Sequence, residues 1–408
     1  MNLKSLLINN SENSLSGTKW HTLKQSIIKS LLSIGNTTIA ELSSELQSSI
    51  PTITKAINEL LADGFVVDMG KISNSGGRRP SLYSISPSSA YFLGIEMGRS
   101  GMSIGIQDLK DEFIGLEIET PFLLENNQES LEEFCSLINS FIEKCEIDKD
   151  KIVGACINLS GRINSMEGFS YNYFYSENRP LTEIIGERIG LPVHLENDTR
   201  ARAFGEYTQG VVDNEQNMLY LNYSWGVGIG IVTNGQLYYG KSGYSGEFGH
   251  SSIFDNEILC HCGKIGCLET VVSGWALIDQ FKKAIESGKQ SMVELEDVPP
   301  TIQHHSIISG ALVQEDSLCI ELITQQTEIM GRYLSVLLNI FNPDLLIIGG
   351  DFSLLGDFVI LPIQAALRKH SLGLVNRDMK LKKSVLGNKA GVIGACQIVK
   401  EKMLASFE

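Results

Sequence analysis

The sequence has few cysteines, and most of them stand apart from one another. Eight are present among 408 residues. Five are scattered, three of these in apolar runs: Cys135, Cys145, Cys156, Cys319 and Cys396. This distribution fits reduced, buried thiols and excludes a dense disulfide framework. The chain also lacks an apolar run of about 18 residues and a basic-then-apolar leader, so we expect a cytoplasmic protein that neither enters a membrane nor is exported.

Positive charge is scarce overall, but it is unevenly distributed. The formal net charge is −15 at pH 7. Residues 18–80 nevertheless carry +2, whereas residues 81–408 carry −17. This asymmetry indicates that the N-terminal segment is suited to binding anions and that the rest of the chain is acidic. The length is sufficient for two or three domains of about 100–200 residues each.

The N-terminal part predicts a polar arm followed by short helices. Residues 1–17 are rich in Ser and Asn and are interpreted as a flexible arm. Apolar residues at helical spacing predict a helix over 19–32. Thr38 followed by Glu41 has the spacing of a capping box, which predicts the start of a second helix.

A third helix and a hairpin complete the predicted N-terminal domain. The helix is expected to begin at Ser48 or Ser49, with a proline tolerated in its first turn. Apolar segments on both sides of residues 74–79 predict a β-hairpin with a basic tip. Three short helices and such a hairpin predict a winged helix-turn-helix domain over residues 18–87.

Polar side chains on the outer face of the third helix are candidate DNA contacts. These short polar or basic groups can enter a major groove, and arginines at the hairpin tip can meet DNA backbone or the minor groove. The candidates are Thr52, Thr54, Lys55, Asn58, Arg78 and Arg79. A winged helix that binds another protein is the alternative interpretation.

After residue 87 the pattern changes to strands alternating with helices. The first cycle is predicted as strands at 92–96 and 102–106, a helix at 130–145 and a strand at 152–159. The second is predicted as strands at 218–221 and 227–232, a helix at 317–340 and a strand at 344–348. Two such cycles predict two α/β lobes within residues 88–408.

Metal-ligand residue types gather in one short segment. Three cysteines with C-x-C-x4-C spacing can supply thiolates, and a nearby histidine can complete a closed tetrahedral Zn²⁺ site that leaves no position for water. The predicted zinc-binding segment spans 250–267, with ligands His250, Cys260, Cys262 and Cys267. Such a zinc would be structural. Small buried residues in a turn are one alternative, and His261 is a competing fourth ligand.

Several motifs from residue 196 onward occur in a specific order. They are Glu196-Asn197-Asp198, the glycine run 226–230, Gly246-Glu247-Phe248-Gly249-His250, Gly266-Cys267-Leu268-Glu269, and Asn342-Pro343-Asp344 leading to Gly349-Gly350. On these motifs the chain resembles the ROK family of bacterial sugar kinases and sugar-responsive repressors, over about residues 18–400. The resemblance implies a two-lobed ribonuclease-H-like (actin-like ATPase, sugar-kinase) α/β fold that holds sugar between its lobes.

The resemblance also implies a sugar site. Its residues would be Gly161, Asn197, Asp198, Glu247, His250 and Glu269. Carboxylates and an amide suit a polyol because they bind several hydroxyl groups at once. Asp198 would correspond to the catalytic base of the kinases. The alternatives are that Asp198 only caps the helix expected at 199–207 and that Glu247 is a surface acid.

The two phosphate-binding turns of the ROK kinases are altered. Their Asp-x-Gly-Gly-Thr turn corresponds to Glu96-Met97-Gly98-Arg99-Ser100, where Arg99 would obstruct close backbone approach to phosphate. Their Gly-Thr-Gly turn corresponds to Ser224-Trp225-Gly226, which loses a hydroxyl contact. Phosphoryl transfer depends on positioned nucleotide, so we expect no enzyme activity and interpret Asp198 as a relic base.

The sequence therefore predicts a ROK repressor that controls genes of carbohydrate uptake or catabolism. Its expected partners are operator DNA and a sugar effector, and a homodimer or homotetramer is expected because operators are commonly two-fold symmetric. An active ATP-dependent sugar kinase with a DNA-binding head is one alternative. A scaffold that binds no sugar is another.

Overall fold

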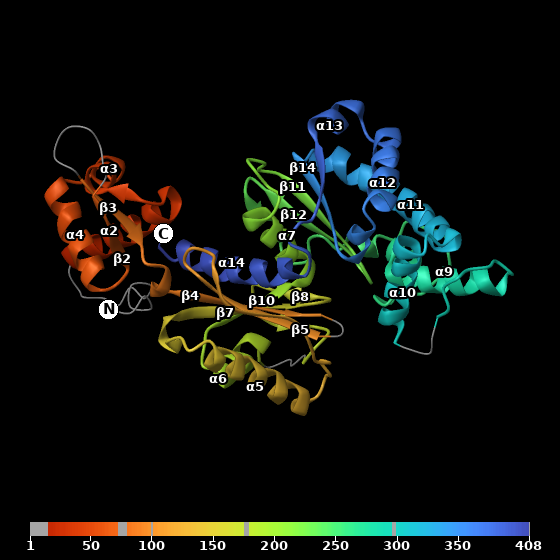
Figure 1. Ribbon diagram of the computed structural model, residues 1–408, viewed down its shortest axis with the longest axis horizontal. Coiled ribbons are helices and arrows are strands. Elements are labelled where there is room, and N and C mark those ends of the chain that lie inside the picture. Colours follow the sequence, from red (N-terminus) through yellow and green to blue (C-terminus); the bar gives the residue numbers. More distant parts are fainter. Residues whose placement is uncertain (1–14, 72–79, 99–100, 175–178, 296–298, 408) are drawn as a thin grey trace. The chain divides into compact units, whose positions relative to one another are not determined.

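The computed structural model describes residues 15–71, 80–98, 101–174, 179–295 and 299–407 (Figure 1). The chain divides into two compact units. Unit 1 contains the described residues up to Asn158, together with Gly168–Leu195 and the segment from Ala395 onward. Unit 2 contains Leu159–Glu167 and Glu196–Gly394.

The first part of unit 1, residues 15–85, is called the head. Its elements are α2 (Leu15–Ile34), β1 (Thr37–Thr38), α3 (Ile39–Glu45), α4 (Ile50–Ala62), β2 (Val66–Lys71) and β3 (Ser81–Ile85). The strands form an antiparallel sheet in the order β1-β3-β2. This is the order of helices and strands expected for a winged helix-turn-helix. Helix α2 begins at Leu15, before the predicted start, because the polar residues ahead of Trp20 give no periodic apolar signal.

The ends of the head helices follow from local hydrogen bonds. The backbone N–H of Glu41 donates to Thr38 Oγ1, and the Glu41 carboxylate accepts from the Thr38 backbone N–H at 2.8 Å, which confirms the capping box. Ser49 caps α4 by accepting the Thr52 backbone N–H. On the inner face of α4, Ile53, Ile57 and Leu60 are fully buried, as the apolar spacing predicts, whereas Leu61 is partly exposed.

A polar brace joins α2 to α4. Trp20 Nε1 donates to Glu59 Oε2 at 2.9 Å, and Lys24 Nζ lies 2.7 Å from the same oxygen. The hydrogen bond from Lys24 is the largest cause of a lowered pKa at Glu59, and the bond from Trp20 adds to it. Lys55 Nζ lies 5.0 Å from the Trp20 ring centroid, within cation–π range. These contacts fix the outer helix α4 against α2.

The remainder of unit 1 contains a five-stranded sheet with the order β10-β7-β4-β5-β6. The strands are β4 (Tyr91–Met97), β5 (Gly101–Asp108), β6 (Phe113–Pro121), β7 (Ile152–Leu159) and β10 (Val193–Asn197), and the helices are α5 (Gln128–Lys144) and α6 (Leu181–Ile189). Strand β4 pairs antiparallel with β5 and parallel with β7. The first predicted strand–strand–helix–strand cycle is therefore confirmed.

Unit 2 is built on a second five-stranded sheet, ordered β13-β12-β11-β14-β15. The strands are β11 (Met218–Tyr223), β12 (Val227–Thr233), β13 (Gln236–Leu237), β14 (Leu345–Gly349) and β15 (Lys380–Lys383). The parallel neighbours β11 and β14 are almost entirely buried and apolar, as central strands are expected to be. The second predicted cycle is also confirmed.

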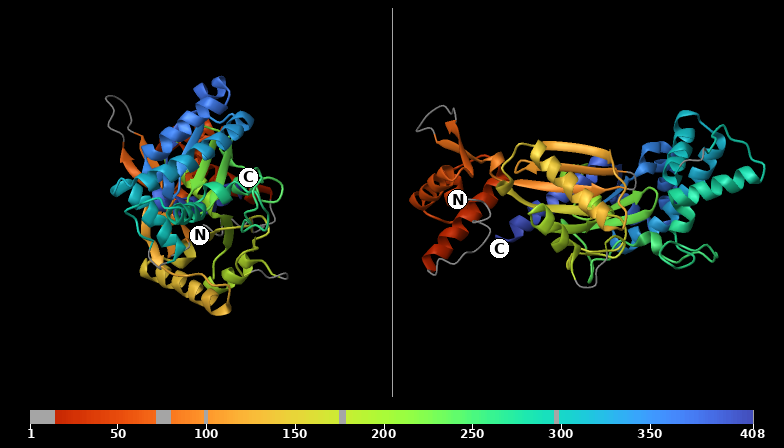
Figure 2. Two further views of the ribbon diagram at one scale, coloured as in Figure 1. Left: turned by 90° about the vertical axis from the view of Figure 1, so that its right-hand side faces the viewer. Right: turned by 90° about the horizontal axis from the view of Figure 1, so that it is seen from below.

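Helices in unit 2 pack around this sheet. They are α7 (Asp198–Gln209), α8 (Glu269–Val272), α9 (Gly274–Glu286), α10 (Pro300–Val313), α11 (Ser317–Phe341), α12 (Asp357–His370) and α13 (Gly373–Asp378), and α14 (Ala390–Ala405) continues into unit 1. Helices α9, α10, α11 and α12 lie side by side (Figures 1 and 2). Their apolar faces join β11, β12 and β14 in one continuous core.

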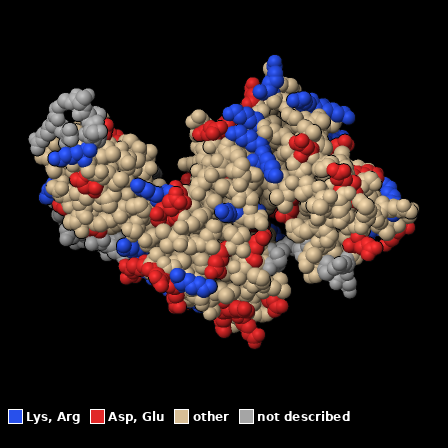
Figure 3. All heavy atoms as spheres, in the orientation of Figure 1, with Lys and Arg blue, Asp and Glu red and all other residues tan. Residues whose placement is uncertain are grey.

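Lysine side chains protect the open edge of the unit 2 sheet. Strand β15 has three lysines in four residues, and basic side chains gather over it and over α13 (Figure 3). Lysine on an edge strand disfavours pairing with another chain.

Within the described part of the chain, no helix combines the length and apolar character that crossing a membrane requires.

Candidate functional site

All six residues of the predicted sugar site belong to unit 2. They lie in three places: just after β7, at the junction of β10 and α7, and in the segment that runs from Glu247, immediately before the short 3-10 helix η3 (Phe248–His250), to the start of α8. The first and last of these residues, Gly161 and Glu269, are more than 100 residues apart in the sequence. The structure brings their polar groups onto the same part of unit 2.

Asn197 connects two of these places. Its Oδ1 accepts the backbone N–H groups of Thr199 and Arg200 at 3.0 and 3.2 Å, so it is the N-cap of α7. Its Nδ2 donates to the Gly161 carbonyl at 3.2 Å. Asp198 is the first residue of the helix, and the capping role considered for it belongs to Asn197.

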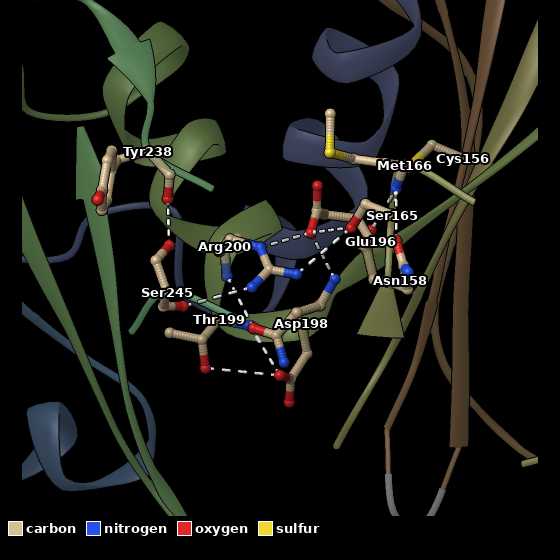
Figure 4. Close-up of polar contacts among 12 residues, drawn as sticks. Cys156, Asn158, Ser165, Met166, Glu196, Asp198, Thr199, Arg200, Tyr238 and Ser245 are labelled. Atoms are coloured by element: carbon tan, nitrogen blue, oxygen red, sulfur yellow. Dashed lines mark hydrogen bonds and ion pairs between the residues drawn. The ribbon is translucent and has the colours of Figure 1, made fainter. Parts of the chain in front are cut away.

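A buried ion pair holds the end of β10 (Figure 4). Glu196 Oε1 accepts from Arg200 Nε at 2.7 Å, from Ser165 Oγ at 2.9 Å and from the Asn197 backbone N–H at 2.7 Å. Both charged side chains are almost fully buried, at 2% exposure for Arg200 and 1% for Glu196. Arg200 Nη1 also donates to the Ser245 carbonyl at 3.4 Å. This network orients the polar segment that follows β10.

Two glycines allow the Glu247–His250 turn to pack tightly on β12. Gly246 has φ +90°, and a Cβ there would lie 2.0 Å from the Ile229 carbonyl oxygen. A Cβ on Gly249 would lie 2.3 Å from the Val227 carbonyl oxygen. The glycines of this motif therefore let the backbone approach the strand and place Glu247 beside the other acids.

Glu247 lies among several charged groups. Burial raises the pKa of Glu247, the charges of His250 and Arg200 lower it, and those of Asp198 and Glu269 raise it. His250 Nε2 lies 3.7 Å from Glu247 Oε2. The Glu247 side chain is 36% exposed, so it is accessible to a ligand without being a freely solvated surface acid.

Glu269 is held more firmly. Its side chain is buried, and Oε2 accepts the Val227 backbone N–H at 2.9 Å. Trp275 Nε1 lies 3.5 Å from Oε1. A carboxylate offers about four acceptor sites, so these two contacts leave further acceptor capacity.

Four metal-ligand side chains form a cluster next to this site. The ligand atoms of His250, Cys260, Cys262 and Cys267 all lie within 4.8 Å of one another. Cys260 Sγ is 3.5 Å from His250 Nδ1, and Cys262 Sγ is 3.6 Å from Cys267 Sγ. The alternative ligand His261 packs its ring against Trp275 instead, with centroids 5.2 Å apart. The cluster is compatible with a structural metal site.

The segment that corresponds to the second kinase phosphate turn is occupied by protein groups. Ser224 Oγ donates to Asp351 Oδ2 at 2.5 Å, and the Asp351 backbone N–H donates back to Ser224 Oγ at 3.2 Å. The Trp225 indole packs against the unit 2 core. In the first turn, Glu96 and Met97 are the last two residues of the buried strand β4, and Arg99 and Ser100 lie outside the described residues.

The candidate DNA contacts on α4 face outward. Lys55 and Asn58 are exposed, and Thr52 and Thr54 are partly exposed. Thr54 Oγ1 donates to the Ile50 carbonyl at 2.8 Å. Thr54, Lys55 and Asn58 line a shallow hollow on the outer side of the helix together with Pro51, whereas Thr52 does not line it. The two hairpin-tip candidates, Arg78 and Arg79, lie outside the described residues.

Comparison with known proteins agrees with this architecture. The chain is 28% identical over 382 residues to a putative xylose repressor of Caldicellulosiruptor sp. (strain Rt8B.4), covering 93% of this chain and 95% of the relative. It is 27% identical over 368 residues to the DNA-binding transcriptional dual regulator NagC of Escherichia coli (strain K12), covering 89% and 88%.

A solved structure is similar over nearly the whole chain. The ROK family transcriptional regulator described as a homologue of the E. coli MLC protein has a TM-score of 0.77 and 26% identity, with 95% of this chain and 98% of that chain covered. The ROK family model matches residues 92–402. The chain therefore belongs to the ROK family.

Proposed function

We propose that this protein is a DNA-binding transcriptional repressor that senses a sugar or sugar derivative and controls genes of carbohydrate uptake or catabolism. One observation carries the proposal: a single chain joins an outward-facing polar helix α4 to a cluster of polyol-binding residue types in unit 2. The names of the similar repressors support it. We assign the DNA-binding domain to residues 18–87 and the sugar-binding domain to 88–408, and the protein acts in the cytoplasm.

The residues proposed to bind the sugar have distinct roles. Glu247 and Asp198 accept hydrogen bonds from sugar hydroxyls, and Asn197 fixes the Gly161 loop through its amide. His250 presents Nε2 as a donor because its Nδ1 faces the cysteines. Thermal-shift measurements with xylose, N-acetylglucosamine and their phosphates identify the effector class, because a ligand that binds only the folded state raises Tm. A scaffold that binds no sugar shows no shift with any of them.

The metal in the Cys/His cluster is proposed to be Zn²⁺. A tetrahedral ion with bonds of about 2.3 Å to sulfur and about 2.0 Å to nitrogen holds its ligand atoms about 3.5–3.8 Å apart. The separations of 3.5 Å from Cys260 Sγ to His250 Nδ1 and 3.6 Å from Cys262 Sγ to Cys267 Sγ fit this geometry. Four protein ligands leave no open position, so the ion supports structure.

Operator recognition is proposed to involve a homodimer or homotetramer that presents two heads to an inverted repeat. Half-sites are then expected about 34–36 Å apart, or at multiples of that spacing. Lys55→Ala and Asn58→Ala should each weaken operator binding by about 1–3 kcal/mol, or about 5- to 150-fold. Fluorescence anisotropy with DNA from upstream of the protein's own gene measures the change.

The matched control for the operator experiment is Lys29→Ala. Lys29 is an exposed lysine on α2, outside the outer face of α4. Lys29→Ala removes the same charge from the head as Lys55→Ala does, but at a position outside the proposed DNA-binding face. Operator affinity should therefore change much less than with Lys55→Ala. Equal losses in the two variants would indicate nonspecific attraction and contradict the assignment of α4. A chain that stays monomeric and gives no footprint would contradict the repressor proposal itself.

The protein is also proposed to lack sugar kinase activity. Trp225 stands where the kinases have a phosphate-binding hydroxyl. Asp351 places a carboxylate beside the neighbouring Ser224, and its negative charge disfavours a polyphosphate there. We expect no sugar-dependent ADP formation above background for any sugar that raises Tm. Robust ADP formation that disappears in Asp198→Ala would instead establish an active kinase with a DNA-binding head.

A further inference from the structure

Two histidines and an aspartate converge in unit 2, apart from the residues assigned to sugar and zinc. His304 and His305 are adjacent on α10, and Asp351 begins the 3-10 helix η4 (Asp351–Leu355) after β14. One potential ligand atom from each lies within 4.8 Å of the others. His304 Nδ1 is 3.9 Å from Asp351 Oδ2, and the two imidazole centroids are 5.3 Å apart. Adjacent helix residues project about 100° apart, so this convergence is not a consequence of helix geometry alone.

The groups around His304 do not provide hydrogen-bond partners for both of its ring nitrogens. Its side chain is 1% exposed, and its buried Nε2 has no hydrogen-bond partner among the described residues. The ring is enclosed by Trp225 and Phe352, at centroid distances of 6.3 and 5.3 Å. A neutral imidazole has one N–H and one bare nitrogen. If Nε2 carries the proton, the lone pair of Nδ1 faces a carboxylate, an arrangement that a cation between them would relieve.

Asp351 is oriented as metal-binding carboxylates commonly are. Ser224 Oγ donates to Asp351 Oδ2 at 2.5 Å, and outer hydrogen bonds of this kind fix the direction of a ligating oxygen. His305 is exposed, so an ion can reach the cluster from solvent. Two imidazoles and one carboxylate suit borderline divalent ions of the first transition row, in contrast to the thiolate-rich zinc cluster.

We propose that His304, His305 and Asp351 form a second metal site, which binds a divalent transition-metal ion in the part of unit 2 that corresponds to the kinase phosphate turn. Three protein ligands leave coordination positions open to water, so the ion should exchange more readily than the four-ligand zinc. An ion there would link α10 to the segment after β14. The proposal is independent of whether the protein binds sugar or DNA.

The test uses tag-free, full-length protein whose zinc content has been measured. Addition of Co²⁺ should give one further equivalent per chain while zinc stays constant. The absorption spectrum should show weak visible d–d bands without a sulfur-to-cobalt charge-transfer band, which separates this site from the cysteine cluster. Mg²⁺ in excess should not displace the cobalt, because imidazole ligands disfavour a hard ion.

Variants distinguish the site from adventitious binding. His305→Ala changes an exposed residue and should retain the fold while losing the extra equivalent. Ser224→Ala should weaken Co²⁺ binding by about 10–100-fold through Asp351. His370→Ala, which removes an exposed histidine at the end of α12, should have no effect. Absence of a further equivalent, or one that persists unchanged in His305→Ala, would overturn the proposal.

Discussion

Cys262→Ser is expected to remove the metal from the Cys/His cluster and to destabilise unit 2. Serine does not replace a thiolate ligand, and structural zinc contributes about 10–16 kcal/mol of apparent binding free energy in small zinc-dependent domains. Cys262 is only partly buried, so the substitution leaves no large cavity. Zinc should fall from about one ion per chain to near zero, and Tm should fall by about 10 °C or more. Elemental analysis and calorimetry measure the two effects.

The control for this experiment is Cys145→Ser. Cys145 is also partly buried, and it lies at the end of α5. It belongs to unit 1, whereas the cluster belongs to unit 2 and lies more than 100 residues further along the chain. The zinc content of the Cys145→Ser protein should equal that of the wild type. Cys262→Ser with unchanged zinc and unchanged Tm would show that the cluster is a set of reduced thiols. The wild-type protein for this comparison must be purified without added metal.

Zinc binding also affects the geometry of the protein residues that are proposed to bind sugar. His250 Nδ1 faces Cys260, and Nε2 lies 3.7 Å from Glu247. A metal on Nδ1 fixes both the ring orientation and the position of the remaining N–H. Cys262→Ser should therefore lower sugar affinity as well as stability, although Cys262 is not itself a sugar ligand in this proposal.

Regular, strongly patterned elements were predictable from the sequence. The 25-residue helix α11 has continuous apolar periodicity, and the structure places it within one residue of the predicted ends. The capping box at Thr38 and the buried strands β7 and β14 follow equally local rules. Strand β15 carries no such signal, because three of its four residues are lysines and it is defined by pairing with β14.

The supporting contacts of the site were less predictable than its motifs. Local motifs identified Asn197, Glu247 and the cysteines, but not the Arg200–Glu196 pair that orients β10. That pair depends on Ser165 and Ser245, which lie far from it in sequence. The carboxylate of Asp351 beside Ser224 likewise arises from a separation of 127 residues. Such contacts follow from the fold, and no spacing rule in a single sequence reveals them.

Sugar binding is expected to change operator affinity, and Glu247→Gln is expected to shift that response to higher sugar concentration. A coupling of about 1–3 kcal/mol corresponds to about a 5- to 150-fold change in DNA affinity. We expect sugar to weaken DNA binding. Hydrogen bonds to charged groups contribute about 1.5–3 kcal/mol, so removing the charge of Glu247 should weaken sugar binding by about 10- to 150-fold. Apo operator affinity should stay unchanged because Glu247 lies in unit 2 and the head in unit 1.

Glu247 is a sharper test of this coupling than Glu269. Replacement of Glu269 by alanine would leave the buried Val227 N–H without its acceptor, so lost stability would be confused with lost response. Glu257→Gln is the matched control, since Glu257 is an exposed glutamate on the same segment. Titrations of operator DNA with and without the sugar, and of sugar with and without DNA, must give the same coupling factor. Tight sugar binding with superimposable DNA titrations would show that unit 2 does not act as a sensor.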